Sequence, residues 1–520
     1  MTQASVSSPP NGSSGVKPGF GTILSRDFIA SIVVFLVAMP LCMGIAVASG
    51  VPAERGLVTG IIGGIVVGAL AGSPLQVSGP AAGLAVIVFE IVAKHGLSML
   101  GPILVVAGAI QLIAGAAKLG NWFRAISPAV VHGMLAGIGV LIVAGQFHVL
   151  FGAKPKANGL ENLAAIPAAL GGVQFSTVTQ VEAALAVGVV TIGSILLWEK
   201  FRPKSLKLVP GALLGVVAGT VLATVLGLDV QKIVVPESIA AAIAVPSVAD
   251  FARMAEPTLL VTAIAVAFIA SAETLLSAAA VDRMHEGERT KYNKELGAQG
   301  VGNMLCGLVG ALPMTGVIVR SSANVQAGAM SRMSAIMHGV WILAFVALLP
   351  WLLRMVPSAA LAGVLVVTGW KLVSLQHVRH LFERYGLLPA VIWAATFAMV
   401  VATDLLTGVL VGMALTLLEL APNLRKMRLS VAQHRLSEDD SEIRLEGAAT
   451  FIQLPKIAKV LDDAPNKGRL RLNTCGLTSL DHTVAEALSD WLKGKARAGV
   501  NVELPSPCAY GDRLRAALAH

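Results

Sequence analysis

Two polar stretches, 76–83 and 313–324, interrupt the apolar sequence where a membrane helix would be expected to be continuous. Each leads into an apolar segment, 81–93 or 322–330, that is too short to cross roughly 30 Å of hydrocarbon as a helix. A helix that starts inside a bilayer leaves its first backbone N–H groups unpaired and positive. Two such starts that face each other would bind an anion at membrane depth.

The two predicted helix starts define a set of residues that could contact an anion. Small side chains at Ala81, Ala82 and Ala323 would let the anion approach the backbone N–H groups. A guanidinium such as that of Arg320 is costly at membrane depth and usually faces a cavity or a partner. The positive charge of Arg320 would attract the anion over a distance through its electrostatic field, or bind it by direct contact. The predicted substrate-binding residues are Gln76, Ser78, Ala81, Ala82, Arg320, Ser321, Ser322 and Ala323.

Two plainer interpretations compete with this site. Gly79 and Pro80 would by themselves mark a turn, but a turn does not explain why the same interruption recurs in the second half of the chain. Arg320 would alternatively pin its own segment through a buried salt bridge to Glu273.

An acidic residue, Glu273, lies midway through the apolar segment 258–280. An intramembrane carboxylate is a functional hypothesis by default. It would hold a coupling Na⁺ with Thr274 and Ser277 nearby, or take up a proton where burial disfavours its charge. We therefore predict Glu273, Thr274 and Ser277 as coupling-ion residues, and an ion pair with Arg320 is compatible with that role.

The remaining side chains do not form a catalytic or metal-binding pattern. No nucleophile–base arrangement is visible, which disfavours an enzyme. The four cysteines, Cys42, Cys306, Cys475 and Cys508, have neither CxxC nor His spacing, so we predict buried thiols without a disulfide or a metal. No cofactor is predicted beyond a bound Na⁺. We interpret the net charge of +9 as a signal of membrane topology, not of nucleic-acid binding.

The elements that position these residues are hydrophobic and long. Of the 520 residues, 55% are hydrophobic and 13% are charged, at a mean hydropathy of +0.76, whereas a soluble protein has about 25% charged residues. The chain is therefore predicted to be an α-helical polytopic membrane protein. Its fourteen apolar segments are 28–48, 56–71, 81–93, 101–117, 128–150, 180–198, 210–227, 258–280, 295–311, 322–330, 334–353, 358–374, 387–403 and 405–421.

The distribution of Lys and Arg supports fourteen crossings with both termini in the cytoplasm. In that topology 19 basic residues fall inside and 7 outside, with Arg320 left out as intramembrane. Fourteen crossings divide into seven plus seven, so the second half inserts upside down relative to the first. The interrupted segments are the third and the tenth, which are equivalent positions in this 7+7 inverted repeat. Broken helices at matching positions of inverted repeats are the best sequence indication of a transport site.

The two ends of the chain differ from its middle. Residues 1–25 are rich in Ser, Pro and Gly, and we predict a disordered cytoplasmic N-terminus without a cleavable signal peptide. Residues 26–425 would form the transmembrane transporter domain. In 430–510, strand-like and helix-like segments alternate, which predicts a small cytoplasmic α/β domain. Residues 511–520 would be a C-terminal tail.

Several short sequences together resemble the SulP family of anion transporters, the sulfate-permease and prestin-like group. Each is weak alone, but the set in this order is specific and extends from Arg26 to about Leu504. The matching sequences are 26–30 and 38–46 in the first segment, 78–82 before the third, 293–300 in the ninth and Arg320-Ser321 in the tenth. The region 430–510 is similar to a STAS domain, the cytoplasmic module that such transporters carry.

The resemblance implies a core domain and a gate domain, with the site between the starts of segments three and ten and transport by movement of one domain against the other. Family members are usually dimers and carry sulfate, chloride, bicarbonate or small dicarboxylates. Two residues depart from the family pattern. Val319 precedes Arg320 where some animal relatives have Ser, and His482 follows Asp481 where regulatory STAS relatives have a phosphorylatable Ser, although Thr483 is adjacent.

The sequence therefore predicts a secondary active transporter of a small anion, with bicarbonate or sulfate favoured, coupled to Na⁺ or H⁺ in the bacterial inner membrane. A proton-coupled dicarboxylate transporter is the alternative in the same class. A nucleobase permease is disfavoured because that group uses an acid in segment ten, where this chain has Arg320. An anion channel and a membrane regulator that acts through the STAS-like domain are the alternatives from other classes. The predicted partners are the anion, the coupling ion, the lipid bilayer and a second copy of the chain, without nucleic acid.

Overall fold

The computed structural model begins with a helix that starts earlier than predicted. α1 (Phe20–Ala48) includes the last residues of the segment 1–25 that was expected to be disordered. Asp27 joins this helix to the segment before α16, because its Oδ1 accepts the N–H groups of Met330 at 2.7 Å and Ser331 at 3.1 Å. The rest of that prediction lies outside the described residues. The structure describes 20–123, 127–156, 159–171, 179–206, 208–233, 242–282, 284–285, 287–373, 379, 382–383, 386–420, 429–435, 440–465, 469–497, 500–505 and 508–518.

Each predicted apolar segment contains a helix, which confirms the polytopic helical fold. Among the described residues, six helices are long and apolar enough to cross a membrane, and the number of crossings stays a prediction. The helices of the apolar segments are α1, α2 (Ala53–Ile62) continued by the π-helical η1 (Gly63–Val67) and α3 (Gly68–Leu70), α4 (Ala85–His95), α5 (Leu100–Ala116), α7 (Pro128–Leu150), α9 (Gln180–Phe201), α10 (Gly211–Val225), α13 (Pro257–Asp282), α14 (Tyr292–Leu308), α15 (Ile318–Gln326), α16 (Met333–Leu348), α18 (Ser358–Leu372), α20 (Leu387–Ala402) and α21 (Leu405–Leu420).

Shorter helices connect these segments. One of them, α8 (Gly159–Gly171), was not predicted from the sequence. The short connecting elements are η2 (Ala82–Leu84), η3 (Leu97–Met99), α6 (Gly120–Phe123), α8, η4 (Lys204–Leu206), α12 (Val248–Ala252), η5 (Arg253–Ala255) and α17 (Pro350–Leu353).

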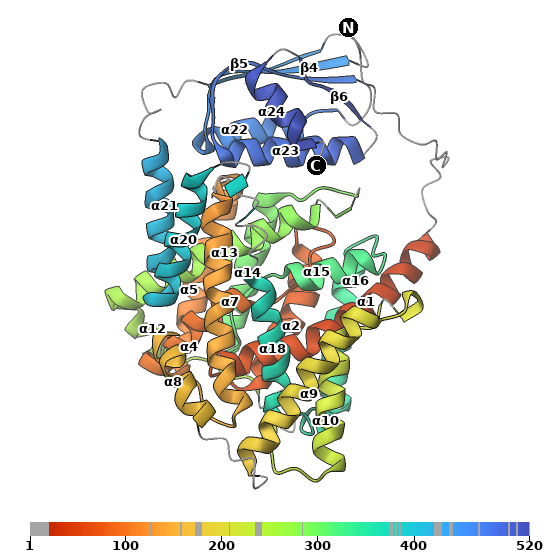
Figure 1. Cartoon of the computed structure of the whole chain (residues 1–520), viewed down its shortest axis with the longest axis vertical. Helices are drawn as coiled ribbons and strands as arrows, with labels where there is room; N and C mark the ends of the chain where they lie inside the picture. Colours follow the sequence, from red (N-terminus) through yellow and green to blue (C-terminus); the bar gives the residue numbers. More distant parts are fainter. Residues whose placement is uncertain are drawn as a thin grey trace.

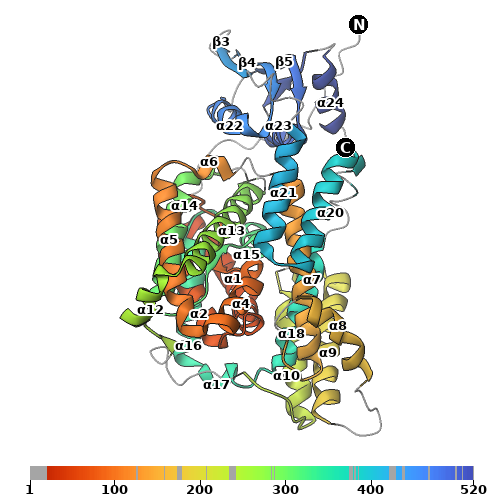
Figure 2. The same cartoon turned by 90° about the vertical axis from the view of Figure 1, so that its left-hand side faces the viewer.

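The membrane helices gather into two bodies that lie side by side (Figure 2). The first body contains α1–α5 and α13–α16, in which α5 packs on α14 and α13, and α1 packs on α2 and α16. The second contains α7–α10, α18, α20 and α21, in which α7 packs on α18 and α20. Contacts of α1 with α18 and α10 join the two bodies. The first body corresponds to the core domain and the second to the gate domain that the resemblance implies.

Glycines let α5 and α14 approach closely in the first body. A Cβ atom at Gly300 would lie 2.5 Å from Leu112 N, and one at Gly108 would lie 2.5 Å from Gly300 O. Small residues at helix interfaces are the usual means of close packing in membranes. The close approach brings the polar residues of α14 into the interior of the first body.

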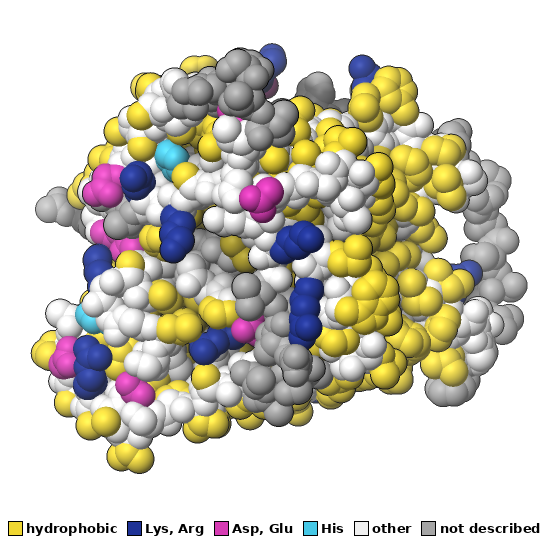
Figure 3. Space-filling view, turned by 90° about the horizontal axis from the view of Figure 1, so that it is seen from below, with side chains coloured by type: hydrophobic (Ala, Val, Ile, Leu, Met, Phe, Trp, Pro, Cys, Tyr) yellow, Lys and Arg dark blue, Asp and Glu magenta, His cyan; other side chains and the backbone are white. Residues whose placement is uncertain are grey.

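Apolar side chains stay exposed on the flanks of the helical bodies. On α9, Val189 and Leu197 are 57% and 60% exposed, and on α10 Val221 is 52% exposed. On the face turned away from the C-terminal domain, charged side chains are scattered over the left-hand side and the middle, while hydrophobic ones gather on the right-hand side (Figure 3). An apolar flank of this extent fits contact with lipid and not with water.

The C-terminal region forms a small α/β layer above the membrane helices (Figure 1). Its sheet has the order β3-β4-β5-β6, in which β3 pairs with β4 antiparallel and the other neighbours are parallel. The helices α22 and α23 lie between this sheet and the membrane helices (Figure 1). The predicted α/β character is confirmed, whereas β3 and α24 were not predicted. The elements are β3 (Leu429–Arg435), β4 (Asp440–Ala449), η7 (Phe451–Gln453), α22 (Leu454–Asp462), β5 (Arg469–Leu480), α23 (His482–Arg497), β6 (Asn501–Glu503) and α24 (Ala509–Leu518).

The prediction of four unbonded cysteines is wrong for two of them. Cys475 on β5 and Cys508 just before α24 form a disulfide, with Cα atoms 5.0 Å apart. They are 33 residues apart in the chain, so no local spacing signals the pair, and they meet because α24 packs on β5. Cys42 and Cys306 are free and buried, as predicted.

Candidate functional site

The two polar stretches meet inside the first body as a short pair of strands. β1 (Ser78–Pro80) and β2 (Met314–Gly316) are antiparallel and buried throughout. Ser78 lies opposite Gly316, and Gly79 lies opposite Thr315. The two interruptions that are far apart in the sequence therefore form one structure, and the helices that follow them start from opposite ends of this strand pair.

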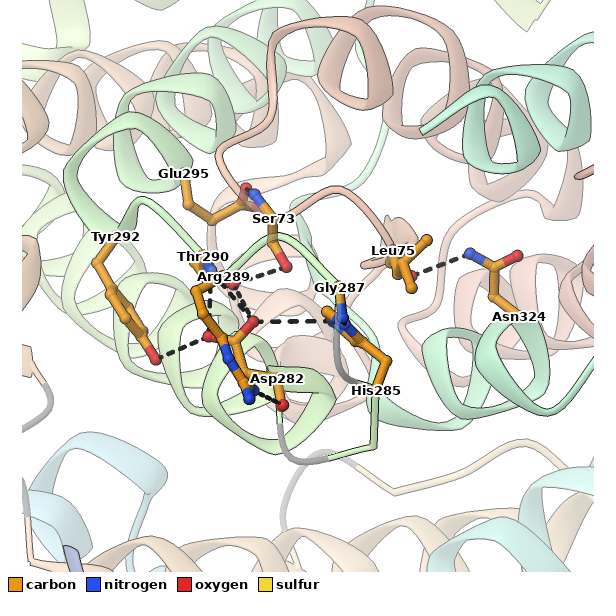
Figure 4. Close-up of polar contacts among 10 residues, drawn as sticks. All are labelled: Ser73, Leu75, Asp282, His285, Gly287, Arg289, Thr290, Tyr292, Glu295 and Asn324. Atoms are coloured by element: carbon orange, nitrogen blue, oxygen red, sulfur yellow. Dashed lines mark hydrogen bonds and ion pairs between the residues drawn. The ribbon is translucent and has the colours of Figure 1, made fainter. Parts of the chain in front are cut away.

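The stretch before β1 has no helix to satisfy its backbone, so other groups must pair with it. Glu295 Oε2 accepts the N–H groups of Gly72 at 2.8 Å and Ser73 at 2.9 Å. Asn324 Nδ2 donates to Leu75 O at 3.0 Å (Figure 4). Side chains from α14 and α15 thus replace the neighbouring strand or helical turn that this backbone lacks.

A polar cluster at the end of α13 holds the same stretch (Figure 4). The Thr290 hydroxyl lies 2.8 Å from Asp282 Oδ1 and 2.9 Å from Ser73 Oγ. Thr290 N–H also donates to Asp282 Oδ1 at 3.1 Å, and the Tyr292 hydroxyl donates to Oδ2 at 3.4 Å. The guanidinium of Arg289 donates to the carbonyl of Asp282. These contacts fix the α13–α14 connection against the entry to β1.

The stretch before β2 is satisfied in a similar way. The Thr59 hydroxyl on α2 accepts Leu312 N–H at 2.9 Å and lies 3.1 Å from Leu312 O. Asn303 on α14 accepts Met314 N–H at 2.8 Å and donates to Met314 O at 3.1 Å. The Asn303 amide therefore pairs with both backbone groups of Met314, as a neighbouring strand would.

The helix start after β1 differs by one residue from the prediction. Ala81 was expected to offer its N–H to an anion, but this group donates to Pro313 O at 3.2 Å. η2 begins at Ala82, so the first-turn N–H groups belong to Ala82 and Gly83. The prediction for Ala81 is therefore wrong, because the strand pairing already uses its N–H.

The helix start after β2 lies earlier than predicted. α15 begins at Ile318, and Ser321 N–H already bonds to Val317 O. Ser322 and Ala323 therefore lie within the helix, and the prediction that their N–H groups face an anion is wrong. The first-turn N–H groups are those of Ile318 and Val319, whose side chains are 37% and 47% exposed.

Arg320 is completely buried next to the strand pair. A Cβ atom at Gly79 would lie 1.9 Å from its Nη1, so only glycine fits beside the guanidinium. None of its three side-chain nitrogens finds an oxygen acceptor among the described residues. Its titratable neighbours are the Cys42 thiol and the His338 imidazole. In the described part of the chain no carboxylate lies within ion-pair distance of Arg320, so the alternative of a salt bridge to Glu273 is not observed.

Glu273 faces the other helix start. Its carboxylate lies against the backbone of Gly83, where a Cβ atom would be 2.8 Å from Oε2. The Gly83 N–H and the Thr315 hydroxyl face this carboxylate. Glu273 Oε2 and Thr315 Oγ1 are both buried and have no close hydrogen-bond partner among the described residues. The carboxylate therefore occupies the start of η2 and keeps oxygen atoms available for a cation or a proton.

The two residues predicted to assist Glu273 have other positions. The Thr274 hydroxyl accepts Gly316 N–H at 3.2 Å, and the Thr274 carbonyl accepts from Gln76 Nε2 at 3.1 Å. Ser277 is buried one turn further along α13. Thr274 thus supports β2, while Thr315 is the hydroxyl that faces Glu273.

The predicted polar donors Gln76, Ser78 and Ser321 all adjoin the strand pair. Ser321 Oγ accepts Val77 N–H at 2.9 Å. Ser78 Oγ accepts from Gln299 Nε2 at 2.6 Å. Gln76 Oε1 is buried and lacks a hydrogen-bond partner among the described residues. Ser322 is partly exposed, and its hydroxyl contacts Met284 Sδ at 3.3 Å.

Sequence reasoning missed four polar residues around the strand pair: Glu295, Gln299, Asn303 and Thr315. The first three recur at intervals of four residues along α14 and are buried. Polar residues at that spacing in an apolar segment form one face of a helix, and this signal could have identified them. No group of three or more His, Cys, Asp or Glu side chains that could hold a metal occurs among the described residues.

Comparisons with known proteins place these features in context. A sequence profile described as "Sulfate permease family" matches residues 24–396. "Putative sulfate transporter YvdB" of Bacillus subtilis is 33% identical over 75% of this chain and 72% of its own. "Bicarbonate transporter BicA" of Picosynechococcus is 26% identical over 81% and 74%. The murine Solute Carrier 26 family member A9 anion transporter in the inward-facing state is similar in structure at 16% identity, with a TM-score of 0.65 over 97% of this chain and 88% of that one.

Proposed function

The chain belongs to the sulfate permease family, whose members are transporters and not enzymes, and from this premise we propose that it transports a small inorganic anion by secondary active transport. Sulfate and bicarbonate are the favoured substrates, because relatives at 33% and 26% identity bear these names. The anion would cross by alternating access, as the first helical body moves against the second. The membrane would be the bacterial inner membrane.

The observation that carries this proposal is the buried, unpaired guanidinium of Arg320 beside two helix starts. An ionised group in a protein interior is costly unless an opposite charge neutralises it. The described residues supply no such charge, so an anion is the missing partner. The N–H groups of Ile318 and Val319 would contact it, and Arg320 would attract it through the field of its charge.

Glu273 supports coupling to a cation. Its Oε2 and Thr315 Oγ1 are buried oxygens without close hydrogen-bond partners among the described residues, and oxygen ligands of this type suit Na⁺ or a proton. We propose that the coupling ion binds Glu273 and Thr315, with the predicted Thr274 and Ser277 further along the same helix. An ion at this position would compensate the negative charge of Glu273 when the anion enters.

The arrangement of the whole chain follows from the same proposal. Residues 26–425 would be the transporter domain, with both termini in the cytoplasm. Residues 430–510 would be a STAS domain, as its mixed sheet and adjoining helices suggest. Most of the predicted tail, 511–520, belongs to α24, which packs on β5 of the same domain. Two copies would form a dimer.

Radiotracer uptake into proteoliposomes tests the proposal. Purified protein would be offered bicarbonate, sulfate, chloride and succinate in turn, with and without imposed Na⁺ and pH gradients. We expect accumulation of an inorganic anion above equilibrium, driven by one of the two gradients. Uptake of succinate alone would favour the dicarboxylate alternative, and equilibration that ignores both gradients would indicate a channel.

A further inference from the structure

A network of buried polar side chains joins β2 to α13 through α14 and α5. Asn303 on α14 accepts Met314 N–H at 2.8 Å and donates to Met314 O at 3.1 Å. The same amide nitrogen donates to Gln111 Oε1 on α5 at 2.8 Å. Gln111 Nε2 in turn donates to Ser271 Oγ on α13 at 3.2 Å. The Ser271 hydroxyl donates to Ala267 O at 2.6 Å, so the network runs from the backbone of β2 to the backbone of α13.

Backbone groups at both ends fix the direction of every bond in this network. A backbone N–H only donates and a carbonyl only accepts, so Met314 determines which way the Asn303 amide points. The Ala267 carbonyl takes the Ser271 hydrogen, which leaves Ser271 Oγ to accept from Gln111. Each side-chain nitrogen and oxygen of Gln111 and Asn303 therefore has a partner of the correct polarity. A buried network that is fully satisfied holds its elements in one arrangement.

The network ends next to both oxygen groups of the candidate cation site. Ser271 comes two residues before Glu273 on α13, and Met314 comes directly before Thr315 on β2. The Thr315 hydroxyl faces the Glu273 carboxylate. Glu273 Oε2 and Thr315 Oγ1 are buried and have no close hydrogen-bond partner among the described residues. The network therefore holds the strand that carries one of these oxygens against the helix that carries the other.

A second, direct attachment lies on the other side of Thr315. Gly316 N–H donates to the Thr274 hydroxyl at 3.2 Å, and Thr274 directly follows Glu273 on α13. Both neighbours of Thr315 are thus tied to α13, Met314 through the network and Gly316 through Thr274. The two attachments fix the backbone of Thr315 without using its hydroxyl.

We propose that Gln111, Asn303 and Ser271 are positioning residues for a bound Na⁺. They hold Thr315 Oγ1 beside the Glu273 carboxylate, so that both oxygens can bind the same ion. A hard cation needs several oxygen ligands at a defined spacing, whereas a proton needs only one oxygen. The inference rests on the proposed function and deepens it by naming the residues that set the geometry of the coupling site.

The experiment measures tracer uptake into proteoliposomes at increasing Na⁺ and saturating anion. Gln111→Met removes both side-chain hydrogen bonds at nearly unchanged length, and Thr315→Ala removes the ligand. Each lost interaction is of the order of one buried hydrogen bond, so we expect the half-saturating Na⁺ concentration to rise roughly threefold to tenfold in each variant. The KM for the anion at saturating Na⁺ should stay nearly unchanged. In the double variant Gln111→Met should add little, because its effect passes through Thr315.

Further variants separate positioning from a general loss of packing. Ser271→Ala removes the acceptor at the α13 end of the network and should raise the half-saturating Na⁺ concentration as Gln111→Met does. Ser271→Thr keeps the hydroxyl and should restore most of the Na⁺ affinity. Gln146→Met is the matched control, because it replaces another buried glutamine, on α7 in the second body. It should leave the half-saturating Na⁺ concentration unchanged.

An unchanged half-saturating Na⁺ concentration in Gln111→Met or in Thr315→Ala would overturn the inference. A full additional effect of Gln111→Met in the Thr315→Ala background would do the same. So would a wild type driven by a pH gradient alone, because a proton needs no second oxygen held beside the carboxylate. If Gln111→Met does not fold, the same cycle with Ser271→Ala decides. A wild type that accumulates no anion under either gradient would instead refute the proposed function itself.

Discussion

At the scale of single residues, Arg320 and Glu273 lie at different parts of the candidate site. Arg320 lies against Gly79 on β1, and Glu273 lies against Gly83 at the start of η2. In the described residues neither side chain neutralises the other, although both are charged and buried near one strand pair. In the proposed function, an anion would compensate the charge of Arg320, and a cation or proton would compensate that of Glu273.

Arg320→Ala should strongly reduce anion uptake while the protein still folds. No buried carboxylate or carbonyl loses a partner in this variant, because no described oxygen accepts from Arg320. The loss of a buried positive charge should raise KM or abolish uptake, measured with the tracer anion in proteoliposomes. Arg320→Lys keeps the charge and should retain part of the activity. Arg332→Ala is the matched control, because this partly exposed side chain donates only to the carbonyls of Ala69 and Ala71 among the contacts described. Normal kinetics in Arg320→Ala would remove this residue from the site.

Glu273→Gln should uncouple transport from the cation. The amide can still face Gly83 N–H and Thr315, but it cannot bind Na⁺ or a proton with a full negative charge. Uptake should therefore lose its dependence on the imposed Na⁺ or pH gradient, as seen by repeating the tracer assay with each gradient clamped to zero. Glu90→Gln, the same substitution at an acid of α4 that is paired with Lys94, should keep the dependence, and an unaltered dependence in Glu273→Gln would exclude the coupling role.

At the scale of elements, the strand pair depends on side chains that form the hydrogen bonds a neighbouring strand or helical turn would otherwise provide. Thr59 and Asn303 satisfy the approach to β2, and Glu295 satisfies the approach to β1. Non-helical backbone at membrane depth persists only where the protein buries and pairs it. The polar face of α14 is therefore as necessary to the site as the two helix starts, although it is not predicted to touch the anion.

Thr59→Val should destabilise this arrangement without changing the shape of the side chain. Leu312 N–H would lose its acceptor in an apolar interior, and an unsatisfied buried donor costs about 1–3 kcal/mol. We expect a lower Tm for the detergent-solubilised protein, measured by thermal unfolding. Thr224→Val on α10 is the control, because that exposed hydroxyl only donates to Thr220 O of its own helix. Equal Tm values for the two variants would show that Leu312 finds another partner.

The sequence was informative where patterning is local. Segment length and polarity located both interruptions, and alternation located β4, β5 and β6. Helix starts were misplaced by one to four residues at Ala81 and Ser322, because strand pairing and the early start of α15 are tertiary effects. The partner of Glu273 was also misplaced, since Thr315 comes from a strand that only the fold brings to α13. The Cys475–Cys508 disulfide had no local signal at all.

At the scale of the whole molecule, the C-terminal domain touches both helical bodies. α22 contacts α6, which packs on α13 and α14 of the first body. His482 at the start of α23 contacts Ser127 before α7 and Glu419 on α21, both in the second body. Since transport would move one body against the other, these contacts link the position of the domain to the state of the transporter.

Asp481, next to this contact, should make the stability of the C-terminal domain depend on pH. Burial raises the pKa of Asp481 to about 6, and the N–H groups of Val484 and Phe451 and the nearby His482 offset this only in part, while Glu419 adds to it. The folded state thus holds the proton more tightly than the unfolded one. The stability that this proton contributes is complete below about pH 4 and is lost as the pH rises through 6.

We therefore expect peptides that contain Phe451 and Val484 to exchange amide hydrogen more readily at pH 7.5 than at pH 5, after correction for the intrinsic rates. Asp481→Asn cannot titrate, so the part of the pH dependence that belongs to Asp481 should disappear in the full-length variant. Identical pH profiles for the wild type and Asp481→Asn would contradict the assignment.

His482 holds the domain to the second body, so His482→Ala should loosen that contact. His482 Nε2 lies 2.9 Å from Ser127 Oγ, Nδ1 lies 3.2 Å from Glu419 Oε1, and the side chain is 4% exposed. Losing both partners from a buried position should cost about 1–3 kcal/mol at the contact, without affecting the sheet of the domain. Hydrogen exchange of the full-length protein should therefore accelerate at the starts of α7 and α23 and stay unchanged in β4 and β5. His434→Ala on β3, where the histidine is exposed, is the matched control, and equal exchange at α7 in the two variants would show that His482 does not hold the domain in place.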